Sequence, residues 1–290
     1  MVINPEKTPT KDLHQYILAA VSPRPIAFVS TVDASGQPNL APYSFFNAFS
    51  SNPPILVFSS NRKVKDNTTK HTLANVEATG EVVINVVTHD MVRQMTLASI
   101  EYEQGVSEFE KAGFTPIASD LVKPFRVKES PINMECKVTR IIPLGEQGGA
   151  GNLIFCKVVR IHIQDEIMDG HRINPHKLDI MGRLGRTNYV RVHGDNISSI
   201  YQSIIKKGIG FDGLPEDIRH SSTLTGNEIA ELAALPALPK IDVFESAMKD
   251  ERVLACAKMP NPKAGIHLYA KDLIAAKKVE YALAVLLSGY

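Results

Sequence analysis

The chain has 290 residues, of which 44% are hydrophobic and 22% charged, so it is long enough to bury a full core in one large domain or two small ones. Its 32 lysines and arginines nearly balance its 31 aspartates and glutamates, which argues against a nucleic-acid or anionic-membrane surface and means that any phosphate is bound locally. Three scattered cysteines, a polar N-terminus and the absence of a long apolar run predict a cytoplasmic protein with reduced thiols that does not insert into membranes.

The region from Ile26 to Val192 is predicted to be mainly β-structure with inserted helices. Its apolar segments are rich in β-branched and aromatic residues and are bounded by turn residues. Short glycine-bearing links indicate hairpins, so we expect antiparallel strands that close into a barrel and no doubly wound sheet. Helices are expected at 71–80 and 89–99, and an irregular segment at 108–114. The six predicted strands are 26–32, 38–46, 54–60, 81–87, 132–142 and 152–164.

The second predicted strand and the turn after it, residues 38–54, mix aromatic with polar side chains. A planar heteroaromatic ligand needs apolar walls for its faces and amide or backbone groups for its polar edge. The alternative is a core strand whose aromatic rings face inward. The aromatic members are Tyr43, Phe45, Phe46 and Phe49, and the polar members are Ser44, Asn47, Ser50 and Asn52.

The third predicted strand runs directly into hydroxyl, amide and cationic residues and then into a helix start, from Phe58 to Thr72. The free N–H groups at the beginning of a helix favour phosphate, and nearby cations add charge-assisted hydrogen bonds. The alternative is a solvated basic loop before an ordinary helix. A short Pro-Pro turn joins this segment to the aromatic strand, so the pair suits flavin mononucleotide (FMN). The candidate capping residues are Asp66, Asn67, Thr68 and Thr69, and the cations are Arg62, Lys63, Lys65 and Lys70.

Residues 173–192 follow the last predicted strand and place Arg183, Arg186 and Tyr189 around two glycines. This arm either covers a ligand or a partner subunit, or is a surface tail of the barrel. The segment PRPI, residues 23–26 at the first strand, is interpreted as a rigid entry turn in which Arg24 pairs structurally.

Residues 208–213 match the pattern GxGxxG, but a predicted helix at 199–207 precedes them and Pro215 follows. A dinucleotide-binding turn needs a strand before it and a helix after it, so we interpret these glycines as a loop. His171 and His176 are five residues apart and do not share a helical face, and we expect no metal site.

After Gly194 the apolar residues repeat at helical spacing, at 241–259 and 270–287, and Thr225 with Glu228 has the spacing of a capping box. The sequence therefore predicts two domains, a barrel at 1–194 and a helical C-terminal extension at 195–290.

Four segments resemble the flavin reductase-like, flavoredoxin-type family, and they follow one another in the family's order within residues 20–192. The resemblance implies a six-stranded antiparallel split β-barrel that binds FMN, with inserted helices. It also implies a homodimer with the flavin near the subunit interface. The segments are SPRPIAFVSTVDASGQPNLAPYSFFNAFSSNPPILVFSS, KDNTTKHTLANVEATGEVVINVVT, ESPINMECKV and MGRLGRTNYVRV.

The resemblance also implies site residues, of which none is a catalytic acid, base or nucleophile. Arg183 is implied to reach the flavin or an incoming nicotinamide. The residues implied to face the flavin ring and its ribityl chain are Thr31, Ser44, Phe45, Phe46 and Asn47. Those implied to hold the phosphate end are Ser59, Ser60, Asn61, Arg62, Lys65, Asp66 and Thr68.

The function that follows is an FMN-dependent oxidoreductase. It would take hydride from NADH or NADPH and pass electrons to free flavin, a quinone-like acceptor or an iron protein. The flavin supplies the redox chemistry, which agrees with the lack of an obvious catalytic triad. Two alternatives stay open: a flavoredoxin-like carrier that binds FMN without nicotinamide turnover, and a binding module whose helical extension docks another protein.

Overall fold

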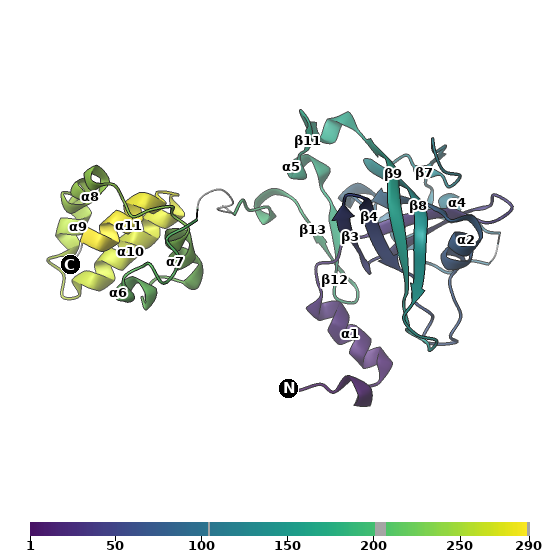
Figure 1. The fold of residues 1–290 in the computed structure, drawn as a ribbon, viewed down its shortest axis with the longest axis horizontal. Coiled ribbons are helices and arrows are strands. Elements are labelled where there is room, and N and C mark those ends of the chain that lie inside the picture. The colour runs from purple at the N-terminus through teal and green to yellow at the C-terminus, as the bar shows by residue number, and fades with distance from the viewer. Residues whose placement is uncertain (104, 201–206, 289–290) are drawn as a thin grey trace. The chain divides into compact units, whose positions relative to one another are not determined.

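The β-rich segments form one antiparallel sheet in the computed structural model, which describes residues 1–103, 105–200 and 207–288 (Figure 1). The sheet has seven strands in the order β2-β1-β5-β8-β9-β4-β3, which confirms the predicted mainly β, antiparallel fold class. The strands are β1 (Ala27–Val32), β2 (Pro38–Tyr43), β3 (Phe46–Ser51), β4 (Pro54–Ser59), β5 (Glu81–Val86), β8 (Ile132–Pro143) and β9 (Asn152–Ile163).

The strand count differs from the six predicted because the segment 38–46 does not stay in one strand. It leaves β2 at Tyr43, and β3 begins at Phe46 and pairs with β4. β2 and β3 stand at opposite ends of the strand order, yet only Ser44 and Phe45 connect them. Two residues span only about 7 Å. The sheet must therefore curl until its two edges meet, which makes a barrel split between β2 and β3.

The alternating side chains of β1 contribute to two hydrophobic cores. Ala27 and Val29 lie in the core enclosed by the barrel, whereas Phe28 lies in a second core with Met91 and Met95. Every residue of β1 is consequently buried. The helix α2 (His71–Thr79) contributes Leu73 and Val76 to the first core, so its apolar face closes the barrel interior.

α2 begins at His71, as the sequence predicts, but none of the predicted capping residues caps it. Its N-cap is Lys70, which makes no side-chain capping bond. Asp66, a predicted capping residue, instead accepts hydrogen bonds from the N–H and the hydroxyl of Thr68, at 3.0 and 2.6 Å. Such local side-chain bonds compete with helix formation. They tie Asp66 to Thr68 in a local turn, so neither side chain is available to cap α2.

The predicted irregular segment at 108–114 contains a helix, α4 (Glu108–Ala112). Burial of Phe109 and Ala112 in the second core supports this short helix, and Gly113 ends it with a φ of 70°. The other helical insert is as predicted, since residues 89–99 form η2 (His89–Met91) and α3 (Val92–Leu97).

The remaining elements before residue 199 lie outside the seven-stranded sheet. The helix α1 (Thr10–Ala20) has no buried residue and extends away from the sheet (Figure 1). A hairpin of β12 (Met181–Leu184) and β13 (Asn188–Arg191) follows the last barrel strand. The short elements are η1 (Pro5–Lys7), β6 (Pro116–Ile117), β7 (Arg126–Val127), η3 (Asp165–Ile167), β10 (Met168–Asp169), β11 (Arg172–Ile173), α5 (Pro175–Leu178) and η4 (Gly194–Asn196).

The chain divides into two compact units, Met1–Ser198 and Ser199–Tyr290. Unit 2 is helical and has a hydrophobic core of its own. The predicted capping box of Thr225 and Glu228 is present at the start of α7. Its described helices are α6 (Glu216–Arg219), α7 (Gly226–Ala233), α8 (Ile241–Met248), α9 (Glu251–Cys256), α10 (Pro262–Ala275) and α11 (Val279–Ser288).

Two long helical patterns of unit 2 are interrupted. Asp250 caps α9 with its carboxylate and so separates α9 from α8, and Lys277, with a φ of 59°, lies between α10 and α11. The segment 208–213 forms a loop, as predicted, while residues 201–206 of the helix predicted before it lie outside the described residues. Within the described ranges, no helix combines the length and the apolar character needed to cross a membrane.

Candidate functional site

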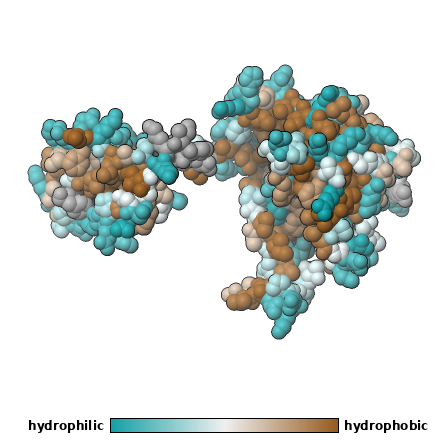
Figure 2. Space-filling model, viewed as in Figure 1, coloured by the Kyte–Doolittle hydropathy of each residue, from teal (hydrophilic) through white to brown (hydrophobic). Residues whose placement is uncertain are grey.

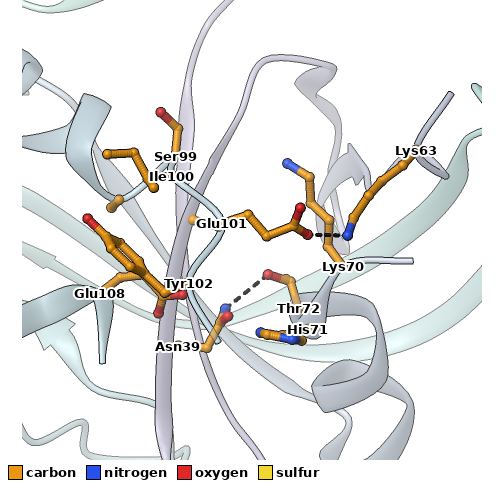
Figure 3. Close-up of a pocket in the computed structure, with 12 residues that line it drawn as sticks. Asn39, Lys63, Lys70, His71, Thr72, Ser99, Ile100, Glu101, Tyr102 and Glu108 are labelled. Carbon is orange, nitrogen blue, oxygen red and sulfur yellow. Dashed lines mark hydrogen bonds and ion pairs between the residues drawn. The ribbon is translucent and has the colours of Figure 1, made fainter. Parts of the chain in front are cut away.

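The candidate site is a cavity of about 190 Å³ at the first turn of α2 (Figure 3). One wall comes from β2, the loop after β4 and the start of α2. The opposite wall comes from the segment that links α3 to α4, with Glu101 and Tyr102, and from α4 itself. The cavity therefore lies where the helix presents its free backbone N–H groups. Its polar lining residues are Asn39, Lys63, Lys70, His71, Thr72, Ser99, Glu101, Tyr102 and Glu108.

Lys70 is the central cation of this cavity. Its Nζ lies 5.1 Å from the centroid of the Tyr43 ring, a cation–π contact. Burial lowers the pKa of Lys70, and the charge of Lys63 adds to this shift while that of Glu101 opposes it. Among the described residues, Lys70 makes no ion pair with a carboxylate. A partly buried ammonium that makes no direct ion pair is a natural position for an anion.

Lys63 and Glu101 form an ion pair across the cavity, from the loop after β4 to the segment after α3 (Figure 3). A second carboxylate, that of Glu108, is only 7% exposed and accepts the backbone N–H of Leu40 at 3.0 Å. Burial raises the pKa of Glu108, although that hydrogen bond opposes the shift. The cavity thus holds charges of both signs, one carboxylate fixed by the backbone and one held by a lysine.

A buried network of side-chain hydrogen bonds supports the start of α2 from beneath. The amide nitrogen of Asn39 donates to Thr31 Oγ1 at 3.2 Å and to Thr72 Oγ1 at 3.0 Å. The amide of Asn75 donates to the same Thr31 oxygen at 3.0 Å. All four residues are at most 8% exposed. The network ties β1, β2 and α2 together and fixes Asn39 and Thr72 in the cavity wall.

Two buried hydroxyl groups next to this network lack a hydrogen-bond partner within the part of the chain that the structure describes. They are the hydroxyls of Tyr43 and Ser60. Tyr43 is 5% and Ser60 1% exposed. Burial raises the pKa of Tyr43 to about 12, although the neighbouring hydroxyls of Thr72 and Ser60 oppose the shift. Neither Tyr43 nor Ser60 lines the cavity, and the pKa of Tyr43 responds to both neighbouring hydroxyls, so we interpret Tyr43, Ser60 and Thr72 as one buried polar cluster beside the cavity.

The predicted phosphate loop mostly bonds to itself. The Arg62 guanidinium donates to the side-chain and backbone oxygens of Asn67 at 2.7 and 2.8 Å. Lys65, Asp66 and Thr68 are exposed, and none of them lines the cavity. Asp66 and Thr68 bond to each other in the turn before α2.

The residues just before that loop bond to the β8–β9 hairpin. Ser59 Oγ donates to Asn61 Oδ1 at 2.8 Å, and the Asn61 amide donates to the Gly149 carbonyl at 3.3 Å. The backbone N–H of Ser60 donates to the Asn152 carbonyl at 3.1 Å. Ser59, Ser60 and Asn61 therefore form the rigid end of β4, directly before the loop that brings Lys63 to the cavity.

The residues predicted to face a flavin ring lie at the split of the barrel. Ser44 accepts a hydrogen bond from Arg24 at 3.3 Å, and the ring of Phe45 meets that of His14 from α1 edge to face. Phe46 is partly buried against the barrel core, and Asn47 is exposed. Because Tyr43, under Lys70, directly precedes Ser44, the predicted ring strand and the cavity are adjacent.

Arg183 lies in the β12–β13 hairpin, on the Arg24 side of the split. Its guanidinium stacks on the Tyr189 ring, 4.7 Å from the centroid, and donates to the Tyr189 hydroxyl at 2.5 Å. Arg24 is 4% exposed and donates to the carbonyls of Val21 and Gly185 at 3.0 and 3.2 Å. The interpretation of Arg24 as a structural residue agrees with these bonds.

None of the residues predicted as flavin contacts lines the cavity, although several neighbour it. Lys63 and Lys70 are two of the four cations that the sequence suggests for a phosphate, whereas Asn39, Thr72 and the wall residues between Ser99 and Glu108 were not predicted. For Lys70 and Thr72, the available sequence signal was the helical spacing that starts at His71. The second wall is remote in sequence, and no local pattern indicates it.

Asp120, Glu135 and His162 bring three potential metal-ligand atoms within 4.8 Å of one another. Glu135 is fully buried, and its carboxylate accepts the N–H groups of Asp120 and Leu121 at 2.8 and 2.6 Å. It also lies 2.6 Å from His162 Nε2, and Asp120 pairs with Arg160 at 2.5 Å. These oxygens already bond to protein donors, so we interpret the group as a structural network.

The similarity to known protein families lies in the barrel region of the chain. The family model described as flavin reductase like domain matches residues 19–175. A protein of Aquifex aeolicus (strain VF5) is 38% identical over 192 residues, which are 66% of this chain and 95% of that protein.

Two solved structures are also similar. Nitrilotriacetate monooxygenase component B from Bacillus cereus is 33% identical, with a TM-score of 0.63, and the match covers 70% of this chain and 98% of that one. The 2-nitrobenzoate 2-nitroreductase NbaA of Pseudomonas fluorescens is 27% identical, with a TM-score of 0.62, over 71% of this chain and 98% of that one. The matched part is almost the whole of each relative but only about two thirds of this chain. With its antiparallel split barrel and a match over residues 19–175, this chain belongs to the flavin reductase-like family.

Proposed function

We propose that this protein is an FMN-dependent oxidoreductase that takes hydride from NADH or NADPH and passes electrons to a flavin or another acceptor. Family membership supports the flavin and the reaction class. The observation that supports FMN in particular is Lys70, a partly buried cation without a carboxylate partner in the described chain, at the open N-terminus of α2. A phosphate monoester provides the negative charge that this position lacks.

The residues fit a phosphorylated flavin. In the proposal, Lys70 and Lys63 bind the phosphate end together with the first N–H groups of α2. The strand residues Ser44 to Asn47 remain our candidates for contacts to the ring.

Bound flavin supplies hydride and single-electron transfer, and the protein contributes binding, orientation and control of solvent. Asn39 and Thr72 are held in place by the network around Thr31, so the cavity wall keeps its shape when a ligand enters. Glu108 places a buried carboxyl in the same wall. Burial raises its pKa, so this group remains protonated to higher pH than an exposed glutamate.

Two relatives named for redox reactions support an external electron acceptor: a nitrilotriacetate monooxygenase component B and a 2-nitrobenzoate 2-nitroreductase. We propose a free flavin, a quinone-like compound or an iron protein as the acceptor class. The physical requirement is only that the acceptor reaches the flavin edge at the split of the barrel.

The test is a visible absorption spectrum of the purified protein with FMN, followed by anaerobic addition of NADH and, separately, NADPH. We expect a bound flavin spectrum that one of the nucleotides bleaches. A protein that binds no FMN at all would contradict the proposal. If neither nucleotide bleaches the bound flavin but a protein reductant bleaches it rapidly, the protein is an electron carrier and the proposed oxidoreductase activity is wrong.

We also propose a cytoplasmic homodimer. The outer edges of β2 and β3 end the sheet, and Phe49, on β3, is 68% exposed. Ile161 on β9 is 52% exposed as well, and apolar side chains are visible on the surface of this unit (Figure 2). Light scattering of the purified protein gives the mass directly; a monomer at micromolar concentration would contradict the dimer.

Unit 2 is proposed as a separate helical domain that docks a partner, because it has its own core and lies outside residues 19–175, which the family model matches. Ending the chain after Ser198 leaves a length close to that of the relatives. If FMN affinity and turnover survive this truncation while a partner is lost, docking is supported. If FMN affinity falls too, unit 2 helps to form the flavin site.

A further inference from the structure

We infer that Glu101 is an internal competitor for the phosphate position, and that it makes this site release its flavin readily. The inference rests on the proposed function, because it concerns the same anion site. It assigns to one carboxylate of the cavity wall a role in ligand affinity and exchange.

The cavity holds two lysines and needs negative charge to balance them. Lys63 and Lys70 bring two ammonium groups into one partly enclosed space, and the charge of Lys63 lowers the pKa of Lys70. Like charges in a region of reduced dielectric repel each other, so a nearby anion stabilises both. Glu101 is the carboxylate that provides this charge, since it pairs with Lys63 and favours the charged form of Lys70.

Glu101 has fewer interactions that hold it in place than Glu108 has. Its side chain reaches into the cavity from the segment after α3 and points to the two lysines (Figure 3). Within the described ranges, Lys63 is its only hydrogen-bonding or ion-pair partner, and the side chain is 59% exposed. Glu108, in the same wall, is held by a backbone N–H and is 7% exposed. Glu101 is therefore the carboxylate of the pair that can leave the lysines without stranding a buried backbone donor.

A phosphate differs from the Glu101 carboxylate in charge and in the number of acceptor oxygens. A phosphate monoester carries a charge of about −1.5 to −2 at pH 7 and three acceptor oxygens, against one negative charge and two oxygens for a carboxylate. It is the stronger ligand for two lysines and displaces Glu101. The displacement nevertheless reduces the net gain, because the Lys63–Glu101 pair is broken each time a flavin binds and re-forms as it leaves.

The consequence is selective for the phosphate. Removing the Glu101 charge strengthens binding of FMN, whose phosphate needs both lysines. It leaves riboflavin, which has no phosphate, largely unaffected. It also slows the dissociation of FMN, because no internal carboxylate is present to take its place.

The experiment compares Glu101→Gln with Glu103→Gln. Glu103 is exposed, lies two residues away in the same segment and does not line the cavity, so it controls for the general change in charge. Dissociation constants for FMN and riboflavin are measured by fluorescence, and FMN dissociation by stopped flow. We expect Glu101→Gln to tighten FMN roughly two- to fivefold, the range for one partly exposed ion pair, with a matching fall in the dissociation rate. Equal FMN affinities for the two variants would overturn the inference while the proposed function stands.

A double-mutant cycle with Lys63→Met locates the effect. If Glu101 competes through Lys63, the gain from Glu101→Gln shrinks when Lys63 is already absent. An undiminished gain would contradict the assigned contact.

A protein that binds neither flavin would instead contradict the proposed function. The inference is then tested with inorganic phosphate by titration calorimetry. Tighter phosphate binding by Glu101→Gln than by Glu103→Gln supports the competitor role, and equal binding overturns it.

Discussion

Glu135 is fully buried and Lys70 partly buried in the barrel unit, and only the charge of Glu135 has a complete set of partners among the described residues. Glu135 is fully buried, accepts two backbone N–H groups and contacts His162 at 2.6 Å. Lys70 has the face of Tyr43 at 5.1 Å and no ion pair with a carboxylate among the described residues.

The difference separates a structural charge from a functional one. A buried charge with a complete set of partners belongs to the fold, whereas a partly buried charge without a direct ion pair marks a place for the charge of a ligand. Arg62 differs from Lys70 in two respects: its guanidinium donates to the oxygens of Asn67, and it does not line the cavity.

The largest expected effect comes from breaking the satisfied charge. Glu135→Gln keeps one acceptor oxygen but turns an amide NH₂ toward the N–H donors of Asp120 or Leu121. We expect the free energy of unfolding to fall by about 3 kcal/mol, measured by urea denaturation. FMN affinity of the folded variant should not change. A loss of stability below about 0.5 kcal/mol would contradict the structural role.

Lys70→Met tests the open charge. We expect FMN binding to weaken by about 1.5–3 kcal/mol, because a charge-assisted bond to phosphate is lost. Riboflavin should lose much less, and stability should hold or rise because a desolvated ammonium is replaced by an apolar chain. Both ligands are measured by fluorescence titration.

The same titration with Lys65→Met decides between the exposed loop cation predicted from the sequence and the cavity cation. We expect Lys65→Met to weaken FMN by less than about 1 kcal/mol, as is usual for an exposed charge. A larger loss than that of Lys70→Met would restore the phosphate site to the loop.

Thr31 is a predicted ring contact. Thr31→Val tests whether it instead affects flavin binding indirectly, through its hydrogen bonds with Asn39 and Asn75. The valine removes the acceptor shared by the amides of Asn39 and Asn75. We expect a loss of about 1–2 kcal/mol in the free energy of unfolding. FMN and riboflavin should lose affinity equally, since the hydroxyl is not a phosphate contact. A variant of unchanged stability with weaker flavin binding would favour a direct contact.

The smallest effect is expected from acid. Burial acts to raise the pKa of Glu135, but hydrogen bonds from Asp120, His162 and Leu121 outweigh it, so the pKa lies below its ordinary value. The ionised form therefore stabilises the fold above the ordinary glutamate pKa of about 4.3, and this contribution is lost as pH falls through the lowered value. Unfolding measured from pH 6 to pH 3 should show this loss, and Glu135→Gln should show less of it. Parallel curves would exclude the assignment.

Most of the barrel is predictable because its signals are local. The strands β1, β4, β5, β8 and β9 follow β-branched and aromatic runs between turn residues, and each is found within one or two residues of its predicted range. The break between β2 and β3 has no such signal. Phe46 follows the same apolar run, and only its pairing with β4 places it in another strand.

The contents of the site are less predictable. The sequence alone determines that a strand, a basic run and a helix follow one another between Pro54 and Thr79, and that residues 20–192 resemble one family. Tertiary structure decides which cation matters, because burial of Lys70 depends on Tyr43 from β2 and on a wall that begins more than twenty residues later, at Ala98. Solvation and pairing of a charge are properties of its surroundings in space, and neighbours in sequence do not define them.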